Sequence, residues 1–142
     1  MFLALLLSLA VAVHDGDTIK LNGTSYRLQG IDAPELAQTC KNADGLKYEC
    51  GKQSRDKLAE FLAGKKVECK SSGKDKYRRQ IAVCYANGQD ANRWMVANGY
   101  AIGYFEYTGT YAREAFKAKD AKLGIWQGEF LFPAKFRHQK RK

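Results

Sequence analysis

Proline and histidine are scarce in this chain of 142 residues, which contains two of each. With so few prolines there is no proline-rich spacer, and neither an internal repeat nor a low-complexity linker divides the sequence. Two histidines, and four cysteines that never occur at C-x-x-C spacing, argue against a zinc site. The longest apolar run, residues 1–13, is shorter than the ~20 residues of a membrane-spanning helix. We therefore expect one folded domain, residues 11–135, without stable membrane insertion.

Negative charge is also in short supply. Lys and Arg total 24 and Asp and Glu total 15, so the formal net charge is +9. Hydrophobic residues make up 45% and charged residues 27%, which is the balance of a folded domain rather than a disordered chain. A small basic domain attracts polyanions, including nucleic acids, anionic lipids and acidic polysaccharides. Charge alone does not choose among them, and a solvated basic surface with no partner is the alternative.

The apolar N-terminus resembles the hydrophobic part of a secretory signal. Ser8 and Ala10 are small residues spaced as in a signal cleavage site. However, no Lys or Arg precedes the apolar run, which continues into the strand-like residues 11–14. We expect residues 1–10 to be a signal-like segment that is unusually short or begins upstream, and the protein to be secreted or periplasmic. The alternative is a buried N-terminal strand with a frayed apolar end.

The four cysteines allow three disulfide connectivities. An even number beside a signal-like start favours disulfides in an oxidising compartment. Cys40 and Cys50 flank a polar loop that contains a glycine, whereas Cys69 and Cys84 lie on two apolar strands joined by a polar connection. Pairing between neighbours, Cys40 with Cys50 and Cys69 with Cys84, is the simplest choice. The alternative is four unpaired, mostly buried thiols.

Strand and turn signals dominate the first half of the chain. Asn22-Gly23 is a strong signal for a two-residue hairpin turn between two alternating segments. The predicted strands cover residues 11–14, 18–21, 25–28, 67–69 and 81–85. Their hairpin-rich order predicts a small closed antiparallel barrel of five strands, of the OB type.

Three helical patterns complete the fold. They cover residues 53–63, 91–98 and 111–123, and each is followed or ended by a glycine. Trp94 and Met95 in the second pattern are interpreted as core residues rather than cofactor contacts. The fold class is therefore α+β, mainly β, with about three helices. We expect the charge-dense residues 136–142 to form a mobile basic tail.

Four carboxylates flank the expected hairpin. Asp15 and Asp17 surround a glycine before its first strand, and Asp32 and Glu35 surround a rigid Ala-Pro step after its second. The antiparallel hairpin places Asp17 near Asp32, at the end away from its turn. A hard cation with oxygen ligands is the natural partner of two converging carboxylates, Ca²⁺ before Mg²⁺, and Glu35 is then left to act on water. The alternatives are an ordinary acidic turn and neutralisation by nearby Lys and Arg.

Residues 74–79, Lys-Asp-Lys-Tyr-Arg-Arg, mix cations with an aromatic residue. Arg binds phosphate oxygens through two parallel hydrogen bonds, and tyrosine can stack on a base. The segment therefore has the chemistry of a nucleotide contact. A solvated charged loop is the alternative.

Taken in order, these motifs resemble the thermonuclease, or staphylococcal-nuclease-like, family. They are DGDT at 15–18, YRLxGIDAPE at 26–35, DKYxR at 75–79, NGYA at 98–101 and GIW at 124–126. The resemblance runs from about Val11 to Trp126, and GIDAPE and DKYxR at this separation are its specific part. The insert after Glu35, with its two cysteines, is similar to the secreted bacterial branch of the family.

The resemblance implies a calcium site and a general base. The carboxylates of Asp17 and Asp32 match the Ca²⁺ ligands, and Ala33 matches the position that offers its backbone carbonyl to the metal. Many members have Thr there, but a carbonyl ligand survives the change to Ala. Glu35 matches the proposed general base.

The resemblance also implies a set of substrate contacts. Arg27 and Arg79 match the two phosphate-binding arginines. Lys76 and Tyr77 match positions that line the nucleotide pocket, and Tyr107 matches a pocket tyrosine with poorer local alignment. These residues would hold the substrate while Glu35 acts on water.

One residue departs from the family pattern. The family usually has Gly between Tyr and Arg in DKYxR, and this chain has Arg78. If that position has a positive φ, Arg78 is strained by about 1 kcal/mol or more. Of the two neighbouring arginines we assign the phosphate contact to Arg79.

The function implied is Ca²⁺-dependent, sequence-nonspecific hydrolysis of DNA and RNA that leaves 3′-phosphate ends. No protein partner is implied, and we expect a monomer. One alternative is a non-catalytic OB-fold module that binds nucleic acid, as in members that lost their acidic and arginine residues. A second alternative is a role on anionic cell-surface polysaccharide, for which the carboxylate and arginine set has no evident use.

Overall fold

The largest sheet in the described part of the chain has six strands. The computed structural model describes residues 11–104 and 109–140, so the signal-like segment 1–10 and Tyr107 lie outside the described residues. Five strands are neighbours in the order β1-β2-β3-β8-β7, and β9 pairs with β8. Their bounds are β1 Val11–Asp15, β2 Thr18–Leu21, β3 Thr24–Leu28, β7 Val67–Lys74, β8 Gln80–Ala86 and β9 Gln89–Asp90.

The five main strands lie where the sequence predicts them, but they do not form the predicted closed antiparallel barrel. The pairs β1–β2, β2–β3 and β7–β8 are antiparallel, whereas β3 and β8 pair in parallel. Among the described residues, β1 and β7 stand at the two ends of the sheet and do not pair with each other. A parallel pair needs a long crossover between its strands, and local turn signals do not reveal which distant strands such a crossover joins.

Within the described residues, four α-helices and one short 3₁₀ helix accompany the strands. They are α1 Cys50–Leu62, α2 Ala91–Ala97, α3 Ala112–Asp120, the 3₁₀ helix η1 Gly124–Gln127, and α4 Pro133–Lys140. The first three α-helices agree with the predicted ones. The fourth covers most of the tail that was expected to be mobile from residue 136 onward. Pro133 suits the first turn of a helix, and Arg137 of this helix is hydrogen-bonded to Glu35. No helix in the described part of the chain is long and apolar enough to cross a membrane.

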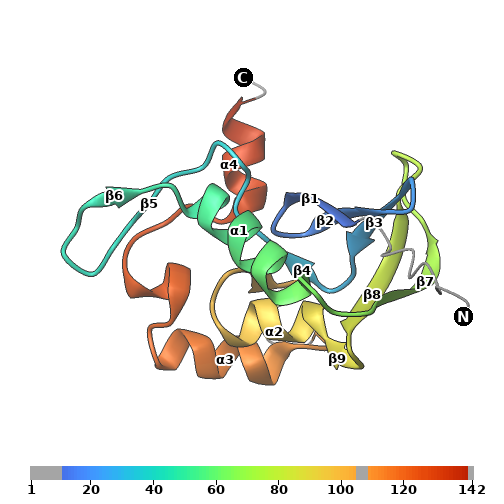
Figure 1. Ribbon diagram of the computed structural model, residues 1–142. Helices are drawn as coiled ribbons and strands as arrows, with labels where there is room; N and C mark the ends of the chain where they lie inside the picture. The colour runs from blue at the N-terminus through green and yellow to red at the C-terminus, as the bar shows by residue number, and fades with distance from the viewer. Residues whose placement is uncertain (1–10, 105–108, 141–142) are drawn as a thin grey trace, which may run out of the picture.

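Two small sheets lie beside the main one. β4 (Ile31–Asp32) pairs with β10 (Ile102–Gly103), and β5 (Cys40–Lys41) pairs with β6 (Lys47–Tyr48). In Figure 1 the β5–β6 hairpin projects at the left, α2 and α3 lie together at the bottom, and α4 stands at the top.

The core lies between the main sheet and helices α1 and α2. Ile19 of β2, Leu58 of α1 and Met95 of α2 are each exposed by 1% or less. Trp94 stacks on Phe61 of α1 with ring centroids 4.6 Å apart, so the prediction that Trp94 and Met95 are packing residues is confirmed. Helix α1 packs against β1, the partner of β2, so the β2–β3 hairpin that carries the candidate site is joined to the core.

Both expected disulfides are present, and no cysteine in the described residues is free. Cys69 and Cys84 oppose each other across the β7–β8 pair, with Cα atoms 4.0 Å apart. Cys40 and Cys50 are both buried and join β5 to the first residue of α1. The Cys40–Cys50 disulfide therefore fixes the chain just after Glu35 to the start of a core helix.

Each disulfide should stabilise the fold. Titration of the denatured, unreduced protein should find no free thiol. The double variants Cys40→Ala/Cys50→Ala and Cys69→Ala/Cys84→Ala close no loop in the unfolded chain, so each should lose about 2–4 kcal/mol of unfolding free energy in urea titrations. Four titratable thiols, or two double variants as stable as the native chain, would contradict the pairing.

Candidate active site

The β2–β3 hairpin and strand β4 bring the predicted carboxylates together around one arginine. Thr18 pairs with Arg27 across the hairpin, and the Leu28 N–H donates to the Asp17 carbonyl at 2.8 Å. Nη2 of Arg27 lies 3.5 Å from Oδ2 of Asp17 and 3.4 Å from Oδ1 of Asp32. The proximity of Asp17 and Asp32 predicted from the hairpin is therefore present in the structure.

Two backbone carbonyls also hold the Arg27 side chain in place. Its Nη1 donates to the backbone carbonyls of Leu28 and Ile31, at 2.7 Å and 2.9 Å. Its side chain is 15% exposed. One guanidinium group thus faces two carboxylates while two carbonyls prevent it from turning away.

The turn before β2 holds Asp17 by close packing and hydrogen bonds. A Cβ atom at Gly16 would overlap the side chain of Ser54 on α1 and that of Ala33, so only glycine lets this turn sit against the helix. The Ala33 N–H donates to Oδ2 of Asp17 at 2.8 Å, and the Thr18 hydroxyl donates to Oδ1 at 3.2 Å. The carboxylate is therefore oriented before any ligand binds.

Burial makes it energetically unfavourable for both carboxyl groups to be ionised. Asp17 is 6% exposed and Asp32 is 3% exposed. Burial raises the pKa of Asp17 from its usual 3.8 to about 6, against the lowering effect of Arg27. Burial likewise raises the pKa of Asp32, against the hydrogen bond from Arg137. Additional positive charge at this point would be stabilising.

The residues fit a hard cation with an incomplete set of protein ligands. Among the described residues, no group of three or more His, Cys, Asp or Glu side chains is arranged to hold a metal ion. Two buried carboxylates with raised pKa values offer the oxygen ligands that Ca²⁺ and Mg²⁺ prefer. Water, backbone carbonyl or substrate oxygens would have to supply the other positions.

Asp75 places the second predicted arginine beside this pair. Its Oδ2 accepts from Nε of Arg79 at 2.7 Å, and its Oδ1 accepts from the backbone N–H groups of Tyr77 and Arg79, each at 2.9 Å. Nη1 of Arg79 then reaches the hydroxyl of Thr18 at 3.3 Å. Sequence reasoning gave Asp75 no role, although a carboxylate that organises its own turn is an ordinary Asx arrangement.

Arg78, which stands where the family usually has Gly, adopts a backbone conformation that favours glycine. Its φ is 66°, in the left-handed region that favours glycine. Its side chain is exposed, whereas that of Arg79 is 29% exposed and bonded to Asp75. The geometry therefore supports Arg79, rather than Arg78, as the residue that faces the carboxylates.

A cavity of about 590 Å³ joins most of the predicted site residues. Tyr77 is 58% exposed at its edge, with the guanidinium of Arg79 5.4 Å and Nζ of Lys76 5.1 Å from its ring centroid. Asp32 and Ala33 are buried beside the cavity. Its lining residues are Asp15, Asp17, Arg27, Glu35, Lys76, Tyr77, Arg79, Tyr104 and Arg137.

Arg137, from α4, is a functional candidate that sequence reasoning missed. Its Nη1 and Nη2 lie 3.0 Å and 3.1 Å from the two carboxylate oxygens of Asp32, and Nη1 lies 2.6 Å from Oε1 of Glu35. These bonds raise the pKa of Arg137, above all the hydrogen bond to Asp32. The surrounding sequence is dense in charge, so nothing in it distinguishes Arg137 as the residue that contacts the site.

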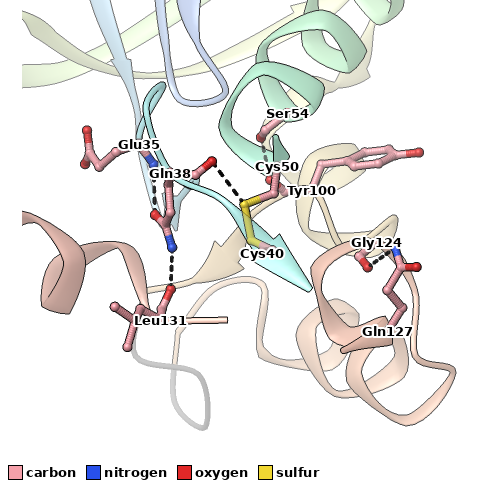
Figure 2. Close-up of a disulfide and its surroundings, with 9 residues drawn as sticks. All are labelled: Glu35, Gln38, Cys40, Cys50, Ser54, Tyr100, Gly124, Gln127 and Leu131. Atoms are coloured by element: carbon pink, nitrogen blue, oxygen red, sulfur yellow. Dashed lines mark hydrogen bonds between the residues drawn. A yellow bond between two sulfur atoms is a disulfide. The ribbon is translucent and has the colours of Figure 1, made fainter. Parts of the chain in front are cut away.

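Gln38 was also missed, and it holds the Glu35 loop in place (Figure 2). Its Oε1 accepts from the Glu35 N–H at 3.1 Å and its Nε2 donates to the Leu131 carbonyl at 2.6 Å. The Gln38 carbonyl lies 3.5 Å from Sγ of Cys50, in the disulfide with Cys40. Gln38 is 1% exposed; its side-chain amide connects Glu35 to the segment that leads into α4, and its backbone carbonyl contacts the disulfide.

Comparison with known proteins shows what the chain is similar to. The family described as "Staphylococcal nuclease homologue" matches residues 25–128. The succinoglycan biosynthesis protein ExoI of Rhizobium meliloti (strain 1021) is 38% identical over 121 residues, which cover 83% of this chain and 63% of that protein. An uncharacterized endonuclease of Haemophilus influenzae is 30% identical over 139 residues, 92% of this chain and 72% of the relative. Endonuclease YhcR of Bacillus subtilis (strain 168) is 38% identical over 132 residues, 80% of this chain and 11% of YhcR.

The chain belongs to the staphylococcal nuclease family. It spans less than two thirds of the Rhizobium protein and about a tenth of the Bacillus one. The family match includes Arg27, Asp32, Glu35 and Arg79. It ends before α4, so Arg137 lies beyond the matched segment.

The raised pKa of Asp17 gives a pH-dependent prediction. In the folded protein the ionised form of Asp17 is disfavoured. Its destabilising effect therefore develops as the pH rises from about 4 to about 6, and it is absent well below pH 4, where Asp17 is protonated in both the folded and the unfolded chain. The stability advantage of Asp17→Asn over the native chain should therefore grow by on the order of 2 kcal/mol as the pH rises from 4 to 7. Urea unfolding of both proteins with chelator at the two pH values measures this change. A stability difference that is equal at both values would contradict it.

Proposed function

We propose that the chain is a metal-dependent, sequence-nonspecific nuclease whose active site is the cavity described above. Membership of the family, with relatives named as endonucleases, supports a hydrolase of the nuclease type. The observation that carries the proposal is the convergence of Asp17, Asp32 and Glu35 with two arginines, each held by its own hydrogen bonds. A phosphodiester is an anion that must meet cations, a metal site and activated water at once, and these residues offer all three.

The proposed metal is Ca²⁺. The carboxylates of Asp17 and Asp32, with the backbone carbonyl of Ala33, would hold it, as the family resemblance implies. When bound, the ion would neutralise charge on the phosphate and act as a Lewis acid. Burial of both carboxylates supports this assignment, because a divalent cation would compensate the negative charge that burial disfavours.

The two arginines would bind the phosphate. Arg27 approaches the carboxylates from β3 and Arg79 from the turn before β8, so they enter the cavity from different elements. Each can donate two hydrogen bonds to phosphate oxygens, and both would interact more strongly as charge builds up on the pentacoordinate phosphorus. Lys76 and Tyr77 at the cavity edge would contact the nucleotide, with Tyr77 stacking on a base.

Glu35 would orient or deprotonate the attacking water. Its side chain is 30% exposed and lines the cavity, so water can reach it. Gln38 accepts from its backbone N–H, which keeps the loop that carries this carboxylate at the edge of the cavity. Attack by water with loss of the 5′ oxygen would leave a 3′-phosphate and a free 5′ hydroxyl.

Substrate range and cellular location are part of the same proposal. The net charge of +9 gives the sequence-independent attraction that DNA and RNA substrates require. The two disulfides are compatible with a secreted or periplasmic protein. We further propose that the protein acts as a monomer and that the β1-β2-β3-β8-β7 path is of the OB type.

The alternatives are disfavoured by the site itself. A module that only binds nucleic acid has no need for two buried carboxylates beside Glu35. The Rhizobium relative is named for succinoglycan biosynthesis, but the present site shows no feature that selects a polysaccharide. Digestion of plasmid DNA with Ca²⁺, and its loss with chelator, separates hydrolysis from both alternatives.

Removing one metal ligand should abolish activity without unfolding the chain. Asp32→Ala should lose Ca²⁺ binding in calorimetry and plasmid cleavage, while its circular dichroism spectrum stays native. Asp44→Ala removes the same charge from the exposed β5–β6 loop and is the matched control. Unchanged Ca²⁺ affinity in Asp32→Ala would sink the assignment.

Loss of the general base should slow the reaction without weakening ground-state binding. In Glu35→Gln the single-turnover rate on a short oligonucleotide should fall by ~10²–10⁴-fold, because the amide cannot accept the proton of water. Affinity for nucleotide should remain nearly native, and affinity for Ca²⁺ should not fall. A full single-turnover rate in this variant would leave water activation to the metal alone.

The two neighbouring arginines should respond differently. Arg79→Lys keeps the charge but loses the paired donors, so turnover should fall more than substrate affinity. Arg78→Gly relieves the backbone strain and should gain about 1 kcal/mol of stability with normal or slightly higher activity. An inactive Arg78→Gly together with a normal Arg79→Lys would reverse the two roles.

A further inference from the structure

Arg137 of α4 is bonded to residues of the proposed active site, although it lies beyond the family match. Its two terminal nitrogens meet both carboxylate oxygens of Asp32, at 3.0 Å and 3.1 Å. The first of them also donates to Oε1 of Glu35 at 2.6 Å. One guanidinium group thus engages a proposed metal ligand and the proposed general base together.

The two arginines on Asp32 are held in different ways. Arg27 is anchored by the carbonyls of Leu28 and Ile31 and touches Oδ1 of Asp32 at 3.4 Å. The side-chain hydrogen bonds of Arg137, within the described residues, all go to Asp32 and Glu35. Arg27 therefore stays in the site whatever binds there, whereas Arg137 is held by the carboxylates alone.

Helix α4 packs lightly on the rest of the chain. Of its eight residues, all of them described, only Pro133 is buried. A cavity of about 370 Å³, lined by Phe136, Arg137 and Lys140, separates the helix from residues 35–37. Few apolar contacts would be lost if the helix moved away from the site.

We propose that Arg137 is a built-in competitor of the metal ion: α4 closes the site through Asp32 and Glu35, and metal binding releases it. This inference rests on the proposed function. A cation on Asp32 needs at least one of the two carboxylate oxygens that Arg137 occupies, and it repels the guanidinium charge at this distance. Release frees Asp32 for the metal and Glu35 for water in a single movement, so the site becomes active when the metal arrives.

Calorimetric titration of the chelator-treated protein with Ca²⁺ tests the competition. Arg137→Ala should bind Ca²⁺ roughly 3- to 30-fold more tightly than the native chain, because no ion pair has to be broken. Arg137→Lys, which cannot bond both oxygens of Asp32 in the same way, should lie between them. Lys135→Ala removes an equal charge two residues away on α4, where the side chain is exposed, and should bind Ca²⁺ nearly as the native chain does.

Hydrogen exchange of the α4 amides tests the release. In the native chain Ca²⁺ should speed exchange over residues 133–140. In Arg137→Ala exchange there should already be fast, and Ca²⁺ should change it little. Slower exchange of α4 with Ca²⁺ in the native chain would overturn the inference.

The calorimetric outcomes separate this inference from the nuclease proposal. If the native chain binds Ca²⁺ and Arg137→Ala binds it no more tightly, the competition is refuted and the proposed function stands. An equal gain in Lys135→Ala refutes it too, since general charge then explains the effect. If neither the native chain nor any variant binds Ca²⁺, the metal dependence and the competition both fail.

Discussion

Two carboxylates buried at the open end of the β2–β3 hairpin are the constraint on which the rest of the site depends. Asp17 and Asp32 are almost fully removed from water, and ionised groups in that position are costly unless they are paired. Arg27 pairs with both from a fixed position, and Ala33 and the turn at Gly16 orient Asp17. The remaining deficit of positive charge explains why a second guanidinium enters the site and why a metal ion would be stabilised there.

Two different parts of the chain hold the residues of the site. Arg27 and Arg79 belong to the sheet and its turns, where backbone carbonyls and Asp75 hold them. On the opposite side, Glu35 stands on a loop that Gln38 ties to the segment before α4 (Figure 2). The disulfide beside Gln38 keeps that loop at the start of α1, so under the proposed release Glu35 stays in the site and only α4 leaves it.

Local chemistry explains which features could be predicted from the sequence. The Asn22-Gly23 turn sets the hairpin register, and that register places Asp17 beside Asp32. Disulfides between neighbouring cysteines follow from the same local logic. Arg78 was expected to be strained if its position had a positive φ, and its φ of 66° meets that condition.

The features that could not be predicted depend on contacts between distant segments. No turn signal reveals that β8 pairs with β3 in parallel after a long crossover. Helix α4 buries one residue, so it has no apolar periodicity that would distinguish it from a charged tail. Its partners, Asp32 and Glu35, lie about a hundred positions earlier, and only the folded chain brings Arg137 to them.

The central claim is that this cavity hydrolyses phosphodiester bonds with metal-assisted attack by water. Mass spectrometry of a short DNA oligonucleotide digested in ¹⁸O-labelled water tests it most directly. With Ca²⁺ the account predicts fragments whose 3′-phosphate carries one ¹⁸O atom and whose partners end in a free 5′ hydroxyl, and intact oligonucleotide with chelator. Label on a 5′-phosphate, or the same cleavage with chelator, would contradict the account.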